Sequence, residues 1–268
     1  MQKSELQILV DNFLKFYSEN KHHKELNEIT EYLLSHALSA RGYNNFRNNQ
    51  QSGESYFIKE ILAKINPKLC IDVGANIGEY TKEILENTSS RVIAFEPVPV
   101  TFEKLRKETE AYIHRITYEN MGVGAFNEEL IIHFNSNALA HASFSEEIKL
   151  INYVANEEKK IVPVVTLDTY VKEKNITQID FIKIDTEGFE AEVLNGATNT
   201  ILEMKPKFIQ IEFNWHQLFK GNSLYDLSQL LQGYEVYQLI PNGWVLRDPK
   251  DPLVNIYNYS NFIFVLNY

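Results

Sequence analysis

The sequence predicts an α/β protein with a doubly wound, mostly parallel sheet and a helical extension at its N-terminus. From residue 68 onward, short β-rich runs alternate with helical segments. These runs are almost continuously apolar, as strands are when helices cover both faces of a parallel sheet. Residues 1–65 lack such runs and instead repeat apolar residues at helical spacing.

The extension is expected to hold two amphipathic helices, because apolar residues recur three and four positions apart on either side of a polar stop. A polar stretch, 44–52, then precedes a short helix over 56–65, which ends before Pro67. We therefore divide the chain into an N-terminal extension, residues 1–52, that caps the main domain or forms oligomers, and a main domain, residues 53–268.

The main domain is expected to contain seven strands with helices between most of them. The strands are expected at 69–73, 91–95, 116–118, 181–184, 208–211, 234–240 and 261–266. The helices are expected notably at 79–86, 101–113, 189–204 and 224–231. The last strand should return antiparallel at or near an edge, because a Pro-Asn-Gly turn and a polar segment poor in helix precede it.

An inserted segment, residues 128–166, interrupts this alternation. It carries two further strand-like runs, 130–134 and 161–165, around a helical piece. The segment is long enough to form part of a lid or an acceptor-side wall.

Charge and composition exclude several classes of function. The formal net charge is -10, whereas nucleic-acid binders generally carry basic surfaces, so nucleic acid is not expected as the main partner. No apolar stretch approaches the roughly 20 residues of a membrane span, and the opening residues lack the pattern of an export signal. Cys70 is the single cysteine and cannot form an internal disulfide. We expect a cytoplasmic protein.

A glycine-containing turn follows the first expected strand. Residues 70–78 read as an apolar strand that ends in a turn with Gly74 and Gly78 and continues as a helix. These glycines let the backbone approach a ligand, and the helix offers unpaired N–H groups, as nucleotide sites require. The alternative is a tight strand-to-helix turn with no ligand.

Glu96 ends the second expected strand. An acidic residue at that place can accept hydrogen bonds from both ribose hydroxyls, because its two oxygens match two neighbouring donors. The alternative is that Glu96 only caps the helix that starts near residues 97–100.

The spacing of the turn argues against a dinucleotide. A pyrophosphate site uses Gly-x-Gly-x-x-Gly, whereas Asn76 stands here between Gly74 and Gly78. Asp72 at the strand end suits a positively charged ligand, such as the amino group and sulfonium of S-adenosylmethionine. It could instead only tie the loop together through backbone N–H groups.

Together these motifs closely resemble those of FkbM-type S-adenosylmethionine-dependent methyltransferases. The resemblance covers roughly residues 53–266, and the Lys-Ile-Asp-x-Glu-Gly-x-Glu block at 183–190 is its most specific part. Further matching segments are 72–78, 95–97, 166–168 and 193–197.

The resemblance implies a Rossmann-like, seven-stranded class I methyltransferase sheet with an antiparallel last strand. It also implies a site for S-adenosylmethionine, in which Glu96 contacts the ribose and the turn at Met121 lies beside the adenine. The residues implied around the methionine portion are Asp72, Gly74, Asn76 and Gly78. Hydroxyl groups of sugars or natural products are the implied acceptors.

Two carboxylates are expected at neighbouring strand ends. Asp185 follows the strand at 181–184 and Glu212 ends the next strand along the chain, so the two side chains should lie together where open parallel sheets bind ligands. They could bind a divalent metal, orient acceptor hydroxyls or raise each other's pKa, and we favour hydroxyl orientation. Glu187 and Glu190 lie where helix capping is the ordinary explanation for a carboxylate.

A hydroxyl acceptor must also lose a proton, and histidine is the usual base near neutral pH. His216, just beyond a strand end, and His141, in the inserted segment, are the two candidates, with Asp185 as an alternative base. Trp215, Phe219 and Tyr225 could form a wall against which a sugar stacks, although such spacing more often reflects simple packing.

We therefore expect an S-adenosylmethionine-dependent O-methyltransferase that acts on a hydroxyl of a glycan or natural product. One alternative is a non-catalytic, methyltransferase-like scaffold whose helical extension binds a partner. A nicotinamide-dependent oxidoreductase is a further alternative, which the glycine spacing disfavours. The extension could also support a homo-oligomer.

Overall fold

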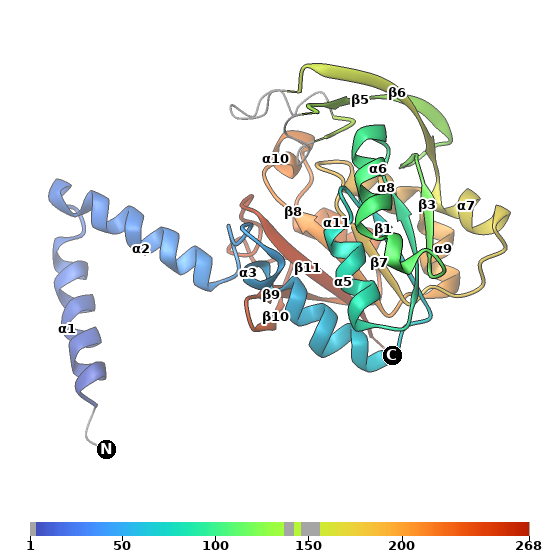
Figure 1. Cartoon of the computed structure of the whole chain (residues 1–268). Coiled ribbons are helices and arrows are strands. Elements are labelled where there is room, and N and C mark those ends of the chain that lie inside the picture. Colours follow the sequence, from blue (N-terminus) through green and yellow to red (C-terminus); the bar gives the residue numbers. More distant parts are fainter. Residues whose placement is uncertain (1–3, 137–141, 146–155, 268) are drawn as a thin grey trace.

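A computed structural model describes residues 4–136, 142–145 and 156–267. Its centre is an eight-stranded sheet in the order β10-β9-β11-β8-β7-β1-β2-β3 (Figure 1). The strands are β1 Leu69–Val73, β2 Arg91–Phe95, β3 Ile116–Glu119, β7 Phe181–Ile184, β8 Phe208–Phe213, β9 Tyr234–Ile240, β10 Gly243–Arg247 and β11 Ser260–Leu266. No helix in the described ranges has both the length and the apolar character needed to cross a bilayer.

Five neighbouring strands, from β3 through β2, β1 and β7 to β8, run parallel. The chain builds outward from β1 to β2 and β3, and then crosses to the other side of β1 to add β7 and β8. This reversal places a crevice at the carboxyl ends of β1 and β7, where open α/β sheets bind their ligands.

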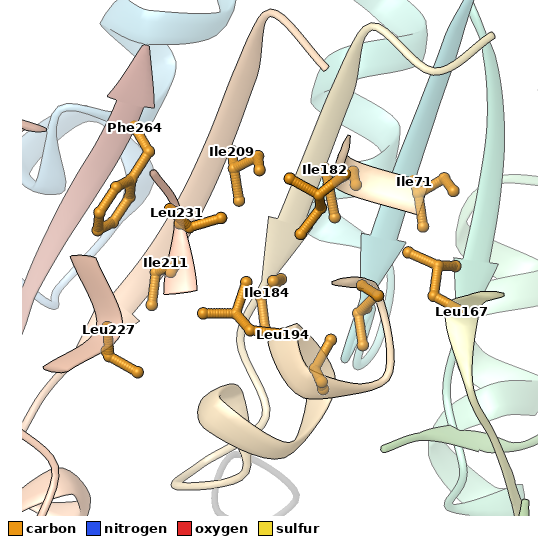
Figure 2. Close-up of a cluster of buried hydrophobic side chains, with 14 of the residues drawn as sticks. Ile71, Leu167, Ile182, Ile184, Leu194, Ile209, Ile211, Leu227, Leu231 and Phe264 are labelled. Atoms are coloured by element: carbon orange, nitrogen blue, oxygen red, sulfur yellow. The ribbon is translucent and has the colours of Figure 1, made fainter. Parts of the chain in front are cut away.

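Helices cover both faces of the sheet, which confirms the doubly wound class. They are α5 Glu79–Asn87, α6 Pro99–Glu108, α7 Leu167–Glu173, α8 Glu190–Asn195, α9 Thr198–Met204, α10 His216–Lys220 and α11 Leu224–Leu230. Figure 2 shows isoleucines of the central strands, among them Ile71 and Ile182, on the same side as Leu167 and Leu194 of α7 and α8. On the other face, Ile84 of α5 belongs to a second buried cluster.

The sheet has one strand more than the seven expected. The final strand, β11, is antiparallel as expected, and it lies between β8 and β9, near one edge but not at it. The edge is β10, which folds back on β9 so that Gly243 pairs with Ile240. Because β10 is mostly half-buried and lies in a polar stretch, it lacks the continuous apolar run that marks the other strands.

One expected helix, 189–204, is two helices in the structure. The chain breaks between α8 and α9 at Gly196, where a Cβ atom would lie 1.9 Å from the carbonyl oxygen of Gly124. The two backbones approach each other too closely there for any side chain, so only glycine fits at the break between the two helices.

The inserted segment forms a separate small sheet. Its strands, β5 Glu128–Phe134 and β6 Glu158–Val165, are joined by β4 Gly122–Val123, which precedes the segment, in the order β4-β6-β5. β5 and β6 contain the two strand-like runs expected from sequence and pair antiparallel. Much of the chain between them, including His141, lies outside the described residues.

The extension begins with α1 Glu5–Asn20, η1 Lys24–Leu26 and α2 Asn27–Ala40, in agreement with the two expected helices. Neither α1 nor α2 contains a buried residue, and in Figure 1 both lie apart from the central sheet. The short helix expected over 56–65 starts earlier and is irregular, as α4 Glu54–Tyr56 followed by a π-helix, Phe57–Leu62, and a 3-10 turn, Ala63–Ile65. The division at residue 52 stays a prediction.

Candidate active site

Two cavities open at the carboxyl ends of the parallel strands. The smaller, about 80 Å³, is bounded by the ends of β1 and β2 and by the small sheet. The larger, about 1020 Å³, reaches from the turn after β1 to the ends of β7 and β8. Both are lined by Gly74, Asn76, Asp185 and Glu187, so these residues mark where the cavities meet.

The turn after β1 lines both cavities, and close packing against neighbouring backbone fixes its conformation. Gly74 has a φ of +83°, and a Cβ atom there would lie 1.8 Å from the carbonyl oxygen of Asp185. Asn76 also adopts a left-handed conformation, and its buried side-chain oxygen has no hydrogen-bond partner in the described structure. Gly78 lines neither cavity, and a Cβ atom there would meet Leu105 of α6 at 2.7 Å.

Asp72 lies beneath this turn and is fully buried. Thr81 of α5 donates a hydrogen bond of 2.5 Å to one carboxylate oxygen. The other oxygen has no partner among the described residues. Burial raises the pKa of Asp72, against the lowering effect of nearby Lys183. Asp72 lines neither cavity. Its visible role is therefore to hold α5 through Thr81.

Glu96 holds two loops together. One oxygen accepts the backbone N–H of Asn76 at 2.9 Å and the other accepts that of Val98 at 2.9 Å. Burial raises the pKa of Glu96 to about 7, although these two hydrogen bonds oppose the shift. Each carboxylate oxygen still has a second lone pair. The capping role and a ligand-binding role are therefore compatible, because Glu96 also lines the smaller cavity.

Met121 lines the smaller cavity next to Glu96. The preceding residue, Asn120, fixes this turn by donating from its side chain to the carbonyl oxygens of Glu96 at 2.8 Å and Pro97 at 3.2 Å. Gly74, Asn76, Glu96 and Met121 therefore share one cavity, although sequence separates them widely.

Asp185 follows β7 and lines both cavities. Its carboxylate lies 2.7 Å from the ammonium group of Lys183, whose side chain is 5% exposed. The ring of Tyr80 lies under the same ammonium group, 4.8 Å from it. Because burial disfavours a charged lysine, the raised pKa of Lys183 shows that the carboxylates around it outweigh desolvation.

Glu212 ends up beside Asp185, as the order of β7 and β8 requires. Asn214 donates a hydrogen bond of 2.7 Å to it. Burial, with Asp185 and Glu187 nearby, raises the pKa of Glu212. Carboxylate oxygens of Asp185, Glu187 and Glu212 lie within 4.8 Å of one another, a set of oxygens that a divalent cation could use.

Glu187 pairs with His216, which sequence reasoning did not predict. The Nδ1 atom of His216 lies 2.9 Å from a carboxylate oxygen of Glu187, and both side chains line the larger cavity. Glu187 has a φ of 52°, in the left-handed region. The next residue, Gly188, packs so closely that a Cβ atom there would lie 3.0 Å from the Cβ of His216. The Glu-Gly pair after a strand end is the local signal that suggests such a turn.

Glu190, by contrast, has the capping role expected of both carboxylates. It accepts the backbone N–H groups of Thr186 at 2.8 Å and Gly188 at 3.1 Å, just before α8. Burial raises the pKa of Glu190 to about 7. Of the three aromatic residues expected to form a wall, Trp215 lines the larger cavity, whereas Phe219 and Tyr225 do not.

The strand order, with its reversal beside β1 and its antiparallel β11, defines a Rossmann-like α/β protein with its site at the carboxyl ends of the strands. The model of the methyltransferase FkbM domain matches residues 72–236, so the chain belongs to this methyltransferase family. The resemblance noted from the motifs is thereby confirmed.

Named relatives are more distant. The chain is 26% identical over 140 residues to the hexuronic acid methyltransferase AglP of Haloferax volcanii, which is 52% of this chain and 54% of that protein. It is 23% identical over 203 residues to the 2-O-methyltransferase NoeI of Sinorhizobium fredii, 69% of this chain and 79% of that protein. The chain thus spans about half the length of AglP.

A solved structure of an O-methyltransferase from Bacillus cereus, in complex with SAH, superposes with a TM-score of 0.45 at 12% identity. The superposition covers 94% of this chain and 96% of that chain.

Proposed function

We propose that this protein transfers a methyl group from S-adenosylmethionine to a hydroxyl group of a sugar, glycan or natural product. The observation that carries the proposal is the junction of the two cavities. Glu96 and Met121, which suit a ribose and a base, line one cavity, and a cluster of carboxylates with His216 lines the other. Gly74 and Asp185 belong to both, so a donor and an acceptor could meet there.

The residues around the smaller cavity suit this cofactor. The side-chain oxygen of Asn76 lacks a partner in the described structure and is an acceptor at the cavity where an amino group would bind, whereas Asp72 lies beneath the turn and lines neither cavity. Glu96 has lone pairs left for ribose hydroxyls, and Met121 offers an apolar surface to a base. When bound, S-adenosylmethionine supplies an electrophilic methyl group on a positively charged sulfur.

His216 and Glu187 are proposed to remove the acceptor proton. A hydroxyl attacks only weakly until its proton leaves, and an imidazole can accept that proton. The carboxylate of Glu187 at 2.9 Å stabilises the imidazolium that forms. Asp185, held by Lys183 at 2.7 Å, is placed to accept a hydrogen bond from the hydroxyl and orient it. Glu212 has the same orienting role in this proposal, and metal binding is its alternative.

The names of two relatives support a sugar acceptor, since one is called a hexuronic acid methyltransferase and the other a 2-O-methyltransferase. The single, buried Cys70 supports action in a reducing compartment such as the cytoplasm.

The test is incubation of the full-length protein with methyl-labelled S-adenosylmethionine and a panel of glycosides and hydroxylated natural products, read by mass spectrometry. A gain of one labelled methyl ether on an acceptor supports the proposal. Cofactor binding without transfer to any acceptor would favour a scaffold. Binding of NADH in place of S-adenosylmethionine would favour an oxidoreductase.

A further inference from the structure

We propose that the acceptor is a neutral glycoside, and that its sugar ring binds against an aromatic wall built by residues outside the methyltransferase family match. This inference rests on the proposed function and narrows the class of substrate. The wall lies in the larger cavity and comes from two segments, Asn44–Asn49 before the match and Tyr257–Tyr259 after it.

The wall exposes aromatic surface to the cavity. Phe46 is 66% exposed although it lines the cavity, and its ring packs edge-on to Tyr259 with the centroids 6.0 Å apart. Trp215 lines the same cavity from the end of β8. A large exposed phenyl ring beside carboxylates and amides is typical of a site that binds a ligand with both apolar C–H faces and hydroxyl groups. A pyranose ring has both.

Hydrogen bonds join the chain before the family match to the chain after it. Tyr43, fully buried, donates to the carbonyl oxygen of Val254 at 3.0 Å. The backbone N–H of Asn44 donates to the carbonyl oxygen of Tyr259 at 2.8 Å. Because the segment before the family match is hydrogen-bonded directly to the segment after it, Phe46 is positioned before any acceptor binds. Such preorganisation lowers the entropic cost of binding.

The charge of the cavity selects against an anionic sugar. Its acidic lining residues are Glu54, Glu79, Asp185, Glu187 and Glu212. Its basic ones are Lys104 and Lys183, and Lys183 is already paired with Asp185. Glu54 and Glu212 are buried, and the other three acidic residues still outnumber the two lysines. A uronate would bring its carboxylate into this field, whereas a neutral glycoside would not.

The experiment uses the full-length protein saturated with S-adenosylhomocysteine and matched pairs of methyl glycosides. The pairs are glucoside with glucuronide and galactoside with galacturonide, and calorimetry measures the affinities. We expect at least one neutral member to bind about tenfold or more tightly than its uronate, as removal of a close like-charge repulsion predicts. Equal or tighter binding of the uronates, or no binding of either neutral glycoside, would overturn the inference.

Substitution of the wall provides a second measurement. Phe46→Ala should weaken binding of the neutral glycoside about three- to tenfold, the range of an aromatic contact, with unchanged affinity for S-adenosylhomocysteine. The matched control is Phe126→Ala, because Phe126 is 70% exposed and lines neither cavity. Glu79→Lys should reduce the ratio between the affinities for the neutral glycoside and for the uronate. An unchanged glycoside affinity in Phe46→Ala would remove the wall from acceptor binding.

The two proposals fail in different ways. A protein that binds no S-adenosylhomocysteine would contradict the proposed function itself. A protein that binds it and methylates a uronate, or an acceptor without a sugar, would contradict only the neutral-glycoside inference.

Discussion

The imidazole of His216 lies 2.9 Å from the carboxylate of Glu187, although one residue follows β7 and the other begins α10. Only 5% of the His216 side chain is exposed. The pair combines a group that can take a proton with a group that stabilises the resulting charge, next to the carboxylates of Asp185 and Glu212.

Replacement of His216 by Ala should lower kcat about 100-fold or more, the usual contribution of a general base, while cofactor affinity stays unchanged. Steady-state kinetics and calorimetry measure the two quantities. His114→Ala, at an exposed position that lines neither cavity, is the control. If kcat survives in His216→Ala, the base is Asp185 or water instead.

The affinity for S-adenosylmethionine should fall as pH is lowered through about 7. The pKa of Glu96 is about 7, above its ordinary 4.5. Ribose hydroxyls would donate to the ionised carboxylate, so binding favours the deprotonated form and releases a proton. Above pH 7 the carboxylate is ionised and can accept these hydrogen bonds. Below pH 7, each pH unit should lower the affinity for S-adenosylmethionine by up to about tenfold.

Glu96→Gln should weaken cofactor binding by about 1–3 kcal/mol at pH 8 and flatten this pH dependence. Calorimetry between pH 5.5 and 8 in buffers of different ionisation enthalpy would report both affinity and proton release. A pH-independent affinity that the substitution leaves unaltered would separate Glu96 from the ribose.

Chelation should leave kcat unchanged if Asp185 and Glu212 orient the hydroxyl without a metal. Burial and neighbouring carboxylates raise the pKa of Glu212, so its side chain tends toward the protonated form, which Gln imitates. We therefore expect Glu212→Gln to retain much more activity than Asp185→Asn. Loss of activity with EDTA, restored by Mg²⁺, would establish Asp185, Glu187 and Glu212 as a metal site.

Deletion of residues 1–40 should convert a homo-oligomer into a monomer and leave the affinity for the cofactor unchanged. α1 and α2 bury no residue and line neither cavity, whereas Leu6, Leu9 and Leu14 are at least 55% exposed. An apolar face of this kind is stabilised by contact with a second copy. Light scattering gives the mass. An unchanged oligomeric state with weaker acceptor binding would show that the extension caps the cleft instead.

Local patterns were sufficient for the central strands and for part of the site. β1 and β2 have the bounds expected from their apolar runs, because both are buried beneath helices on both faces. The proximity of Asp185 and Glu212 was also predicted, since strand ends in a parallel sheet meet at one edge. β10 was missed because a half-buried edge strand needs no continuous apolar run.

The chain's own residue pattern determined the fold class, the strand ends at which the candidate site lies and the methyltransferase family, because periodicity and spacing act over a few residues. Tertiary structure decided which distant groups meet. Only packing brings Glu187 to His216, joins Asn44 to Tyr259 and leaves Phe46 facing the cavity. Such contacts depend on how whole elements pack and on buried charge, and no short stretch of sequence records them.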